Sequence, residues 1–339
     1  MPMVSGVKKS LVLMAATVVL AGGAAVVASA EARQPATTSA VSAADDGNGQ
    51  AKRQRPLVIA HRAGTADFPE NTVRAIRGAL EQKVDMMWLS VQVSKDGVPV
   101  LYRPGDLSSL TNGSGSVADK TAQELTRLNA GYQFKQGDQY PYRDPAQATP
   151  LPTLEQALRA LPQHMPVLLD MKSDNTELLV PALKKTLDHL AGDGVPTWQR
   201  IRFYSTEKKN LDALADRPDA RIFEDRDTTR TRLAVSRLAG ECQAPPTKGT
   251  STAFELHRDV TVEEKFTLGT GRSPVKQALM WDKPTVACFR THPAVDITLI
   301  GINTKDDYQT AMKLGANAVL ADSPKTMMKI KNTLPPSAH

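Results

Sequence analysis

The chain has 339 residues, of which 41% are apolar and 23% are charged, and it carries a formal net charge of +6. This composition excludes an intrinsically disordered or fibrous protein, and an α/β barrel of about 250 residues would fit within the chain as one domain. The basic residues are scattered rather than gathered in a stripe, so the charge does not indicate a nucleic-acid-binding protein.

Residues 1–30 have the features of a secretory signal peptide. Lys8 and Lys9 form its positive segment, residues 11–27 are apolar, and Ala28-Ser29-Ala30 supplies small residues for cleavage after Ala30. Loss of this leader leaves 40 basic and 36 acidic residues, a net charge of +4. The alternative is an uncleaved anchor, because the apolar stretch is near the minimum of about 17 residues for a membrane span. We therefore predict an exported protein, periplasmic or secreted, without a stable membrane span after cleavage.

Residues 31–55 have no apolar periodicity and are rich in small and polar side chains, which predicts a disordered linker. The folded domain is expected over residues 56–335. Export permits a disulfide between Cys242 and Cys288, which would add about 4 kcal/mol of stability in the chain-entropy model. Two buried free thiols are the alternative.

The folded region alternates between strand-like and helix-like segments. Short apolar runs predict strands at residues 57–60, 86–93, 166–171, 200–204, 221–223, 252–256, 297–302 and 318–321. Apolar residues at helical spacing predict helices at residues 71–82, 153–161, 176–190, 207–215, 228–238, 306–314 and from 324 onward. The turn Lys95-Asp96-Gly97, followed by residues 98–102, predicts a hairpin beside the second strand. The stretch 258–296 is the least readable, and its apolar run at 285–289 leaves the strand count uncertain by one.

Eight strands that alternate with helices predict a (β/α)8 TIM barrel with a small hairpin and loop insertion after the second strand. A doubly wound open sheet is the alternative, but the first strand is not followed by the glycine fingerprint that such a fold carries. The carboxyl ends of barrel strands form the site, and His61-Arg62 stands at the end of the first strand. This pair can handle a proton and an anion together.

Several short stretches, taken together, resemble the glycerophosphodiester phosphodiesterase family, whose barrel is shared with phosphatidylinositol-specific phospholipases C. The matching stretches are Ile59-Ala60-His61-Arg62, Pro69-Glu70-Asn71-Thr72, Ser94-Lys95-Asp96-Gly97-Val98-Pro99-Val100, Leu110-Thr111-Asn112-Gly113-Ser114-Gly115, Leu151-Pro152-Thr153-Leu154-Glu155, Asp170-Met171-Lys172, and Leu314-Gly315-Ala316 leading to Ala321-Asp322-Ser323-Pro324. They run in family order from Pro56 to about residue 330. The resemblance implies a TIM barrel with phosphoric diester hydrolase activity.

The departures from the family pattern fall on the chemistry. The family has Glu-x-Asp on the second strand as two metal ligands, where this chain has Trp88-Leu89-Ser90. The family's second catalytic histidine is replaced by Arg103, and its third metal ligand by Asp170. The first histidine and its arginine are retained, as are Glu70, Lys172 and Asn303 after the seventh strand.

These replacements predict that the chain has no cofactor and no divalent metal site. Mg²⁺ and Ca²⁺ prefer several carboxylate oxygens. Trp88 supplies no ligand atom, and Ser90 is a weak neutral ligand. Only Asp170 remains as a carboxylate, with Asp106 and Glu70 as further candidate ligands from outside these strands. If strands two and three point these side chains inward, they lie together near His61, because alternate strand residues share a face.

The residue types still suit a phosphodiester. His61 is expected to act as general base, while Arg62, Arg103 and Lys172 bind phosphate. Arg103 cannot replace the family's acid, because a guanidinium does not release a proton in proteins. The site therefore combines strong anion capture with weak proton transfer. The alternative for His61 is a histidine that is tied into a core hydrogen-bond network.

Other residues are expected to support the site. They are Glu70, Ser90, Asp170, Asn303 and Asp322. Glu70 could instead favour the dipole of the first helix, and Asp322 either orients His61 or Arg62 or caps the last helix.

The aromatic residues Trp88, Tyr102 and Tyr204 could wall a pocket for a choline or ethanolamine head group by cation–π contact. The alternative is that Trp88 fills a collapsed metal cavity.

We therefore predict an exported glycerophosphodiester phosphodiesterase-like protein that acts metal-independently or with much reduced activity. Its ligand would be a small phosphodiester or a phospholipid head group, and the sequence predicts neither which head group nor an oligomeric state. The alternative is a non-catalytic binding protein on the same barrel. A weaker possibility is a sugar-processing barrel with Asp170 and Glu255 as its carboxylate pair.

Overall fold

The computed structural model describes residues 55–335, so the predicted signal peptide and all of the predicted linker except Arg55 lie outside the described residues. The described chain divides into two compact units. Residues 258–278 belong to the smaller unit, and the remaining described residues form the larger one. No helix within the described residues is long and apolar enough to cross a membrane.

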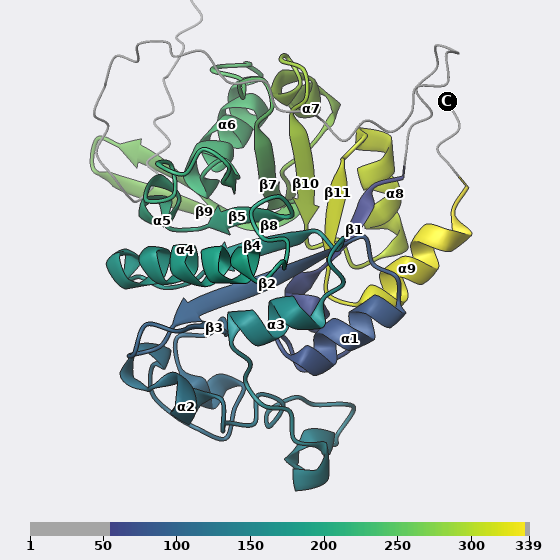
Figure 1. Ribbon diagram of the computed structural model, residues 1–339. Coiled ribbons are helices and arrows are strands. Elements are labelled where there is room, and N and C mark those ends of the chain that lie inside the picture. Colours follow the sequence, from purple (N-terminus) through teal and green to yellow (C-terminus); the bar gives the residue numbers. More distant parts are fainter. Residues whose placement is uncertain (1–54, 336–339) are drawn as a thin grey trace, which may run out of the picture. The chain divides into compact units, whose positions relative to one another are not determined.

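The larger unit is a parallel β-barrel surrounded by helices, as predicted (Figure 1). Within residues 55–335, its eight parallel strands are β1 (Leu57–Ala60), β2 (Met86–Val93), β4 (Val167–Met171), β5 (Ile201–Ser205), β6 (Arg221–Ile222), β7 (Ser251–Glu255), β10 (Asp296–Ile300) and β11 (Ala318–Ala321). Their order is β6-β5-β4-β2-β1-β11-β10-β7. A parallel bridge between Phe223 and Ser251 joins the two ends of this order and closes the barrel.

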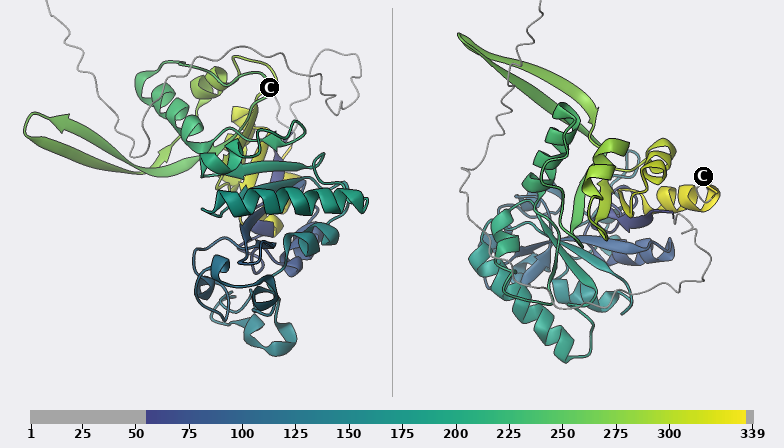
Figure 2. Two further views of the ribbon diagram at one scale, coloured as in Figure 1. Left: turned by 60° about the vertical axis from the view of Figure 1, so that its left-hand side comes forward. Right: turned by 90° about the horizontal axis from the view of Figure 1, so that it is seen from above.

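Helices follow the strands on the outside of the barrel, as the views in Figure 2 also show. They are α1 (Val73–Glu81), α3 (Leu154–Ala160), α4 (Thr176–Gly192), α5 (Lys208–Asp212), α6 (Arg226–Ala239), α7 (Lys283–Phe289), α8 (Lys305–Leu314) and α9 (Pro324–Thr333). Most of them begin at a residue whose side-chain oxygen accepts a backbone N–H of the first turn, for example Thr72, Asp225 and Thr304.

The apolar run at residues 285–289, which left the strand count open, is helical. Asp282 caps α7 by accepting the backbone N–H of Thr285, and a proline stands in the first turn. Both features favour the start of a helix over a strand. The barrel therefore has the eight strands that the sequence predicted, counted over residues 55–335.

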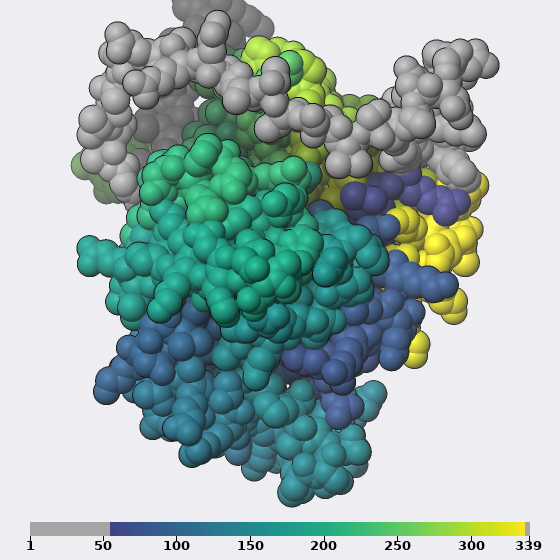
Figure 3. Space-filling model, in the orientation of Figure 1, coloured from purple at the N-terminus to yellow at the C-terminus, as the bar shows by residue number. Residues whose placement is uncertain are grey.

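The predicted insertion follows β2. It begins with β3 (Pro99–Leu101), which pairs antiparallel with β2, and continues through the short helix α2 (Ala122–Leu125). Its 3-10 turns are Leu107–Ser109, Val117–Asp119, Pro141–Arg143 and Pro145–Gln147. The insertion has a small core of its own, built on Val100, Tyr102 and Leu107 among others. In Figure 3 its side chains continue without a break into those of the neighbouring helices.

Residues 258–278 of the smaller unit form nearly all of a two-stranded hairpin that the sequence did not predict. The hairpin consists of β8 (His257–Phe266) and β9 (Gly269–Leu279). Lys276 and Gln277 on β9 bond to Asp259 on β8. None of the side chains on its two strands is buried, so the hairpin lacks the buried apolar face that indicates a strand in a sequence.

The barrel interior is filled by side chains that point inward from alternate strand positions. They include Ile59, Met86, Trp88, Leu168, Tyr204, Phe223, Ala253, Ala318 and Leu320. A cavity of about 430 Å³ opens at the amino ends of the strands, where Arg202 pairs with Asp296. Because barrel sites lie at the other end, this cavity is not the candidate site. Outside the barrel, Cys242 and Cys288 form a disulfide that ties the segment after α6 to α7.

Candidate functional site

The carboxyl end of β1 turns sharply into a single 3-10 turn, His61–Ala63. Arg62 and Ala63 have left-handed backbone angles, with φ of 49° and 64°, which are uncommon for residues other than glycine. The turn is held in place because the N–H of Ala66 donates to the carbonyl of Asp322 at the end of β11. Backbone strain of this kind concentrates at functional sites.

His61 is oriented by two residues from the neighbouring strand ends. Its Nδ1 lies 2.6 Å from Oδ1 of Asp322, and Asn303 donates to the other carboxylate oxygen at 2.7 Å. The hydrogen bond with His61 lowers the pKa of Asp322 to about 2, so this carboxylate is ionised at neutral pH. Asp322 therefore orients the ring, whereas the cap of the last helix is Ser323. A carboxylate at Nδ1 sets the tautomer and directs Nε2 to its partner.

The other ring nitrogen of His61 faces Arg62. Nε of Arg62 lies 3.1 Å from Nε2 of His61, and its guanidinium also donates to Glu70 at 2.5 Å. Nε2 therefore accepts a hydrogen bond, which is the state that a general base requires. Glu70 holds this arginine, and the cap of α1 is Thr72.

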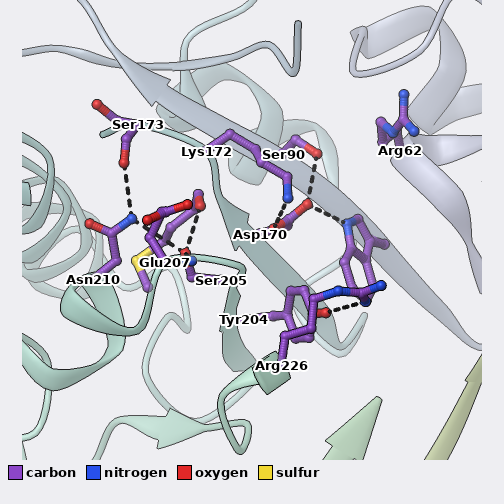
Figure 4. A network of polar contacts seen from close by, with 12 residues as sticks. Arg62, Ser90, Asp170, Lys172, Ser173, Tyr204, Ser205, Glu207, Asn210 and Arg226 are labelled. Carbon is purple, nitrogen blue, oxygen red and sulfur yellow. Dashed lines mark hydrogen bonds and ion pairs between the residues drawn. The ribbon is translucent and has the colours of Figure 1, made fainter. Parts of the chain in front are cut away.

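Asp170 on β4 is the centre of a second cluster, drawn in Figure 4. Its Oδ2 receives the indole N–H of Trp88 at 3.2 Å and, more weakly, the hydroxyl of Ser90 at 3.4 Å. Nζ of Lys172 lies 3.1 Å from Oδ1. This oxygen is buried and accepts no well-directed hydrogen bond, so the ammonium group is its main compensation. Adjacent strands bring these side chains together, because Ser90 stands in register with Asp170.

The cluster does not suit a divalent cation. Asp170 is its one carboxylate, and both of its oxygens face hydrogen-bond donors or an ammonium group that would repel a metal ion. Oε2 of Glu70 accepts from Arg62 and its buried Oε1 has no hydrogen-bond partner, while Asp106 accepts backbone N–H groups within the insertion. Within residues 55–335, no three His, Cys, Asp or Glu residues gather as a metal would require.

Two of the three aromatic residues that were expected to wall a head-group pocket do lie together. The rings of Trp88 and Tyr204 are 4.9 Å apart, and Trp88 also meets the ring of His61 edge-on at 6.2 Å. Their side chains are almost wholly covered, with 3% and 2% exposure. Trp88 therefore fills the barrel where the family has a metal ligand, in agreement with the filler interpretation.

Tyr102 does not join them. Its ring lies in the core of the insertion, and its hydroxyl donates to the carbonyls of Asp106 and Leu107. The expectation that Tyr102 lines a pocket is corrected on this ground, because a residue just past β3 turns toward the insertion that follows it.

Arg103, the next residue, is exposed, and over residues 55–335 it shows no hydrogen bond or ion pair. Tyr102 anchors this position beside the mouth, because its N–H donates to the carbonyl of Ser90. The phosphate-binding role of Arg103 stays a prediction.

Arg226, the first residue of α6, was not among the site residues predicted from the sequence. This side chain reaches over the barrel mouth, where it donates to the hydroxyl of Tyr204 at 3.1 Å and to both oxygens of Glu255 at 2.5 and 2.7 Å. Its guanidinium also lies 4.5 Å from the ring centre of Phe254. Arg226 shortly follows β6, the fifth strand of the barrel, and this position could have indicated a site residue. The motifs that resemble the family do not include it. Since Glu255 is held by Arg226, and Asp170 by Lys172, neither carboxylate is placed as the free acid of a sugar-processing pair.

The fold and the site define a TIM-barrel protein of the phosphodiesterase type. The model of the glycerophosphoryl diester phosphodiesterase family matches residues 61–230. The chain is also 47% identical over 271 residues to the uncharacterized protein Rv2277c of Mycobacterium tuberculosis, covering 79% of this chain and 87% of that protein. The chain therefore belongs to the glycerophosphoryl diester phosphodiesterase family.

A further relative and two solved structures are also similar to this chain. The chain is 26% identical over 298 residues to a glycerophosphodiester phosphodiesterase of Bacillus subtilis, covering 86% of this chain and 91% of that enzyme. The crystal structure of the phosphodiesterase domain of Rv2277c is similar, with a TM-score of 0.74, 45% identity, and coverage of 81% of this chain and 99% of that one. A phosphodiesterase of Oleispira antarctica in complex with its product sn-glycerol-3-phosphate shares the fold, with a TM-score of 0.59, 21% identity, and coverage of 82% and 97%.

Proposed function

We propose that this protein is an exported phosphodiesterase that cleaves glycerophosphodiesters without a divalent metal ion, with His61 as its general base. The observation that carries the proposal is the orientation of His61. Its Nδ1 is held by Asp322 and its Nε2 faces Arg62, at the carboxyl end of a barrel strand. Family membership supports the reaction class, and the relatives named above include enzymes that act on such diesters.

Arg62 links phosphate binding to activation of the base. In the structure its Nε donates to the lone pair on Nε2 of His61, while its Nη1 donates to Glu70. A phosphate group is a strong acceptor for guanidinium donors, often through two parallel hydrogen bonds. Binding of the substrate therefore draws Arg62 from His61 to phosphate oxygens and frees Nε2 to accept a proton.

The reaction follows from this geometry. Nε2 of His61 takes the proton of a glycerol hydroxyl, whose oxygen attacks phosphorus while the bond from phosphorus to the head-group oxygen breaks. The leaving alkoxide takes its proton from water, because Arg103 stands where the family has its acid and cannot supply one. The hydroxide that results opens the cyclic glycerol phosphate formed by the first attack, and His61 returns its proton to the glycerol oxygen that is released, so that glycerol phosphate is the product. Loss of a positioned acid lowers rates by about 10²–10⁴-fold, so we expect slow turnover.

The protein's own cations take the place of a metal ion in this proposal. The side chains of Lys172 and Arg62 are each 18% exposed at the mouth. Each can therefore reach a phosphate oxygen while its carboxylate partner holds the side chain in place. Lys172 is fixed by Asp170, which the indole of Trp88 fixes in turn. Positioned cations stabilise the charge that builds up on phosphate in the transition state.

Export is supported by two independent features. Residues 1–30 have the pattern of a signal peptide, and the Cys242–Cys288 disulfide is typical of proteins from oxidising compartments. Mass spectrometry of the exported protein should find an amino terminus at Glu31. An intact leader would indicate a membrane anchor instead.

The test uses the purified protein with glycerophosphodiesters that carry glycerol, inositol, choline or ethanolamine head groups. Release of glycerol phosphate is measured with and without EDTA, beside the His61→Ala variant. We expect turnover that EDTA does not change and that His61→Ala lowers by roughly 10²–10⁴-fold. EDTA-sensitive turnover would contradict metal independence, and turnover that His61→Ala leaves unchanged would contradict the role of His61 as base.

The exposed Arg103 also favours a second candidate, a non-catalytic phosphodiester-binding protein, because it adds a cation where the family has an acid. This candidate predicts no turnover with any diester, together with binding that Arg62→Ala weakens in calorimetry.

A further inference from the structure

The barrel topology places Arg226 across the mouth from His61. In the closed order of strands, β6 lies opposite β1, so the residue that follows β6 faces the turn that follows β1. Arg226 is joined there to Tyr204 at the end of β5 and to Glu255 at the end of β7. We call Arg226, Tyr204 and Glu255 the far-side triad.

The direction of attack assigns a substrate part to this side. In phosphoryl transfer the attacking and leaving oxygens lie roughly in line through phosphorus. If His61 activates the glycerol hydroxyl, the glycerol lies beside β1 and the leaving head group points toward the opposite strands. The far-side triad therefore faces the head group.

The aromatic rings of the mouth are not available to a head group. A quaternary ammonium group is bound by exposed aromatic faces. Trp88 and Tyr204 are only 3% and 2% exposed, and each packs against the other. Burial raises the pKa of Tyr204 to about 12, so its phenol, which accepts from Arg226, stays neutral rather than becoming an anion that would attract choline.

The accessible atoms of the triad are hydrogen-bonding atoms. The side chains of Arg226 and Glu255 keep 12% and 25% exposure, and Nη2 of Arg226 donates to both carboxylate oxygens of Glu255. Such a pair offers donors and acceptors side by side, which suits neighbouring hydroxyl groups. A cationic head group would meet the guanidinium, and an anionic one would meet the carboxylate.

We propose that the far-side triad selects neutral polyhydroxy head groups, such as glycerol or inositol, over choline and ethanolamine. Arg226 donates to one hydroxyl oxygen and Glu255 accepts from its neighbour, while Tyr204 holds the guanidinium in position. This inference rests on the proposed function, because it assigns the head group of the same reaction. It replaces the aromatic pocket that the sequence suggested.

The test compares kcat/KM for glycerophosphoinositol and glycerophosphocholine. A site built to hydrogen-bond hydroxyls discriminates strongly against ligands that lack them, so we expect the inositol compound to be favoured by at least about tenfold. Arg226→Met keeps the apolar stem and removes the donors, and Glu255→Gln keeps the shape and removes the charge. Each should bring the ratio close to one.

Arg230→Met is the matched control. Arg230 lies one turn further along α6 and pairs with Asp227 rather than with a residue of the triad, so this variant should keep the wild-type ratio. Thermal melting shows whether each variant is folded, and if Arg226→Met does not fold, Glu255→Gln decides the test.

A wild-type ratio near one, or a ratio that neither triad variant lowers, would overturn the inference while leaving the proposed function intact. Absence of turnover with all head groups would overturn the proposed function instead. In that case, calorimetry of the two diesters with the wild-type protein decides whether the triad selects inositol. Equal dissociation constants for the two diesters would overturn this inference as well.

Discussion

Replacing Lys172 by methionine should destabilise the folded protein far more than the loss of a surface ion pair would. The side chain of Asp170 is 5% exposed, and that of Lys172 is 18% exposed. Removing one partner of a buried pair leaves an uncompensated charge and typically costs about 3–5 kcal/mol. Because Trp88 and Ser90 still donate to Asp170, we expect a value of about 3 kcal/mol, at the lower end of this range.

A double-mutant cycle separates the charge from the lost packing. Asp170→Asn removes the negative charge and keeps the shape, so combining it with Lys172→Met should recover most of the stability. Lys184→Met is the control, because Lys184 pairs with Asp216 at 2.6 Å but the aspartate side chain is 73% exposed. Exposed pairs contribute about 0–1 kcal/mol.

Equilibrium urea unfolding at pH 7, with and without EDTA, measures these differences as shifts in the midpoint at unchanged slope. The reasoning is refuted if Lys172→Met costs no more than Lys184→Met. It is also refuted if EDTA lowers the stability of the wild-type protein, because Asp170 would then be held by a metal ion rather than by the ammonium group.

Three further predictions concern the same end of the barrel. Asp322→Asn should lower kcat less than the roughly 10²–10⁴-fold expected for His61→Ala, because the ring loses its orientation but keeps its base; a larger loss in Asp322→Asn would contradict the orienting role. The pKa of Asp322 is about 2 in the folded protein, below its ordinary value of 3.8, so its contribution to stability is present above pH 4 and is lost as the pH falls toward 2. Its side chain is 38% exposed, so solvent screening reduces this contribution to about 1 kcal/mol, and acid unfolding of Asp322→Asn should lack that part of the pH dependence. Restoring the family pattern with Trp88→Glu and Ser90→Asp should create a site for Mg²⁺ or Ca²⁺ beside Asp170, measured by calorimetry; a double variant that folds and binds no ion would show that more than these ligands has been lost.

The sequence determined the barrel because its signals are local. Each strand is a short apolar run, and each helix has its own periodicity and a capping residue such as Thr72 or Asp225, so the eight strands could be recognised one at a time. His61 and Lys172 were recognised in the same way, because each stands at the end of a strand within a short motif, and Asn303 was recognised by its place after the seventh strand. The hairpin of residues 257–279 was missed because its strands bury no apolar face that would leave a period of two.

Only the tertiary structure decided what these residues do to one another. Asp322 and His61 are 261 positions apart in the chain, and they meet because β1 and β11 are neighbours in the closed barrel. Arg226 belongs to no motif, and its position over Tyr204 and Glu255 results from the meeting of three strand ends. Tyr102 turned into the insertion although it stands two residues after Val100 in a matching stretch. A sequence pattern reports which side chains stand at the ends of strands, whereas closure of the barrel determines which of them share hydrogen bonds, because those contacts join residues that are distant along the chain.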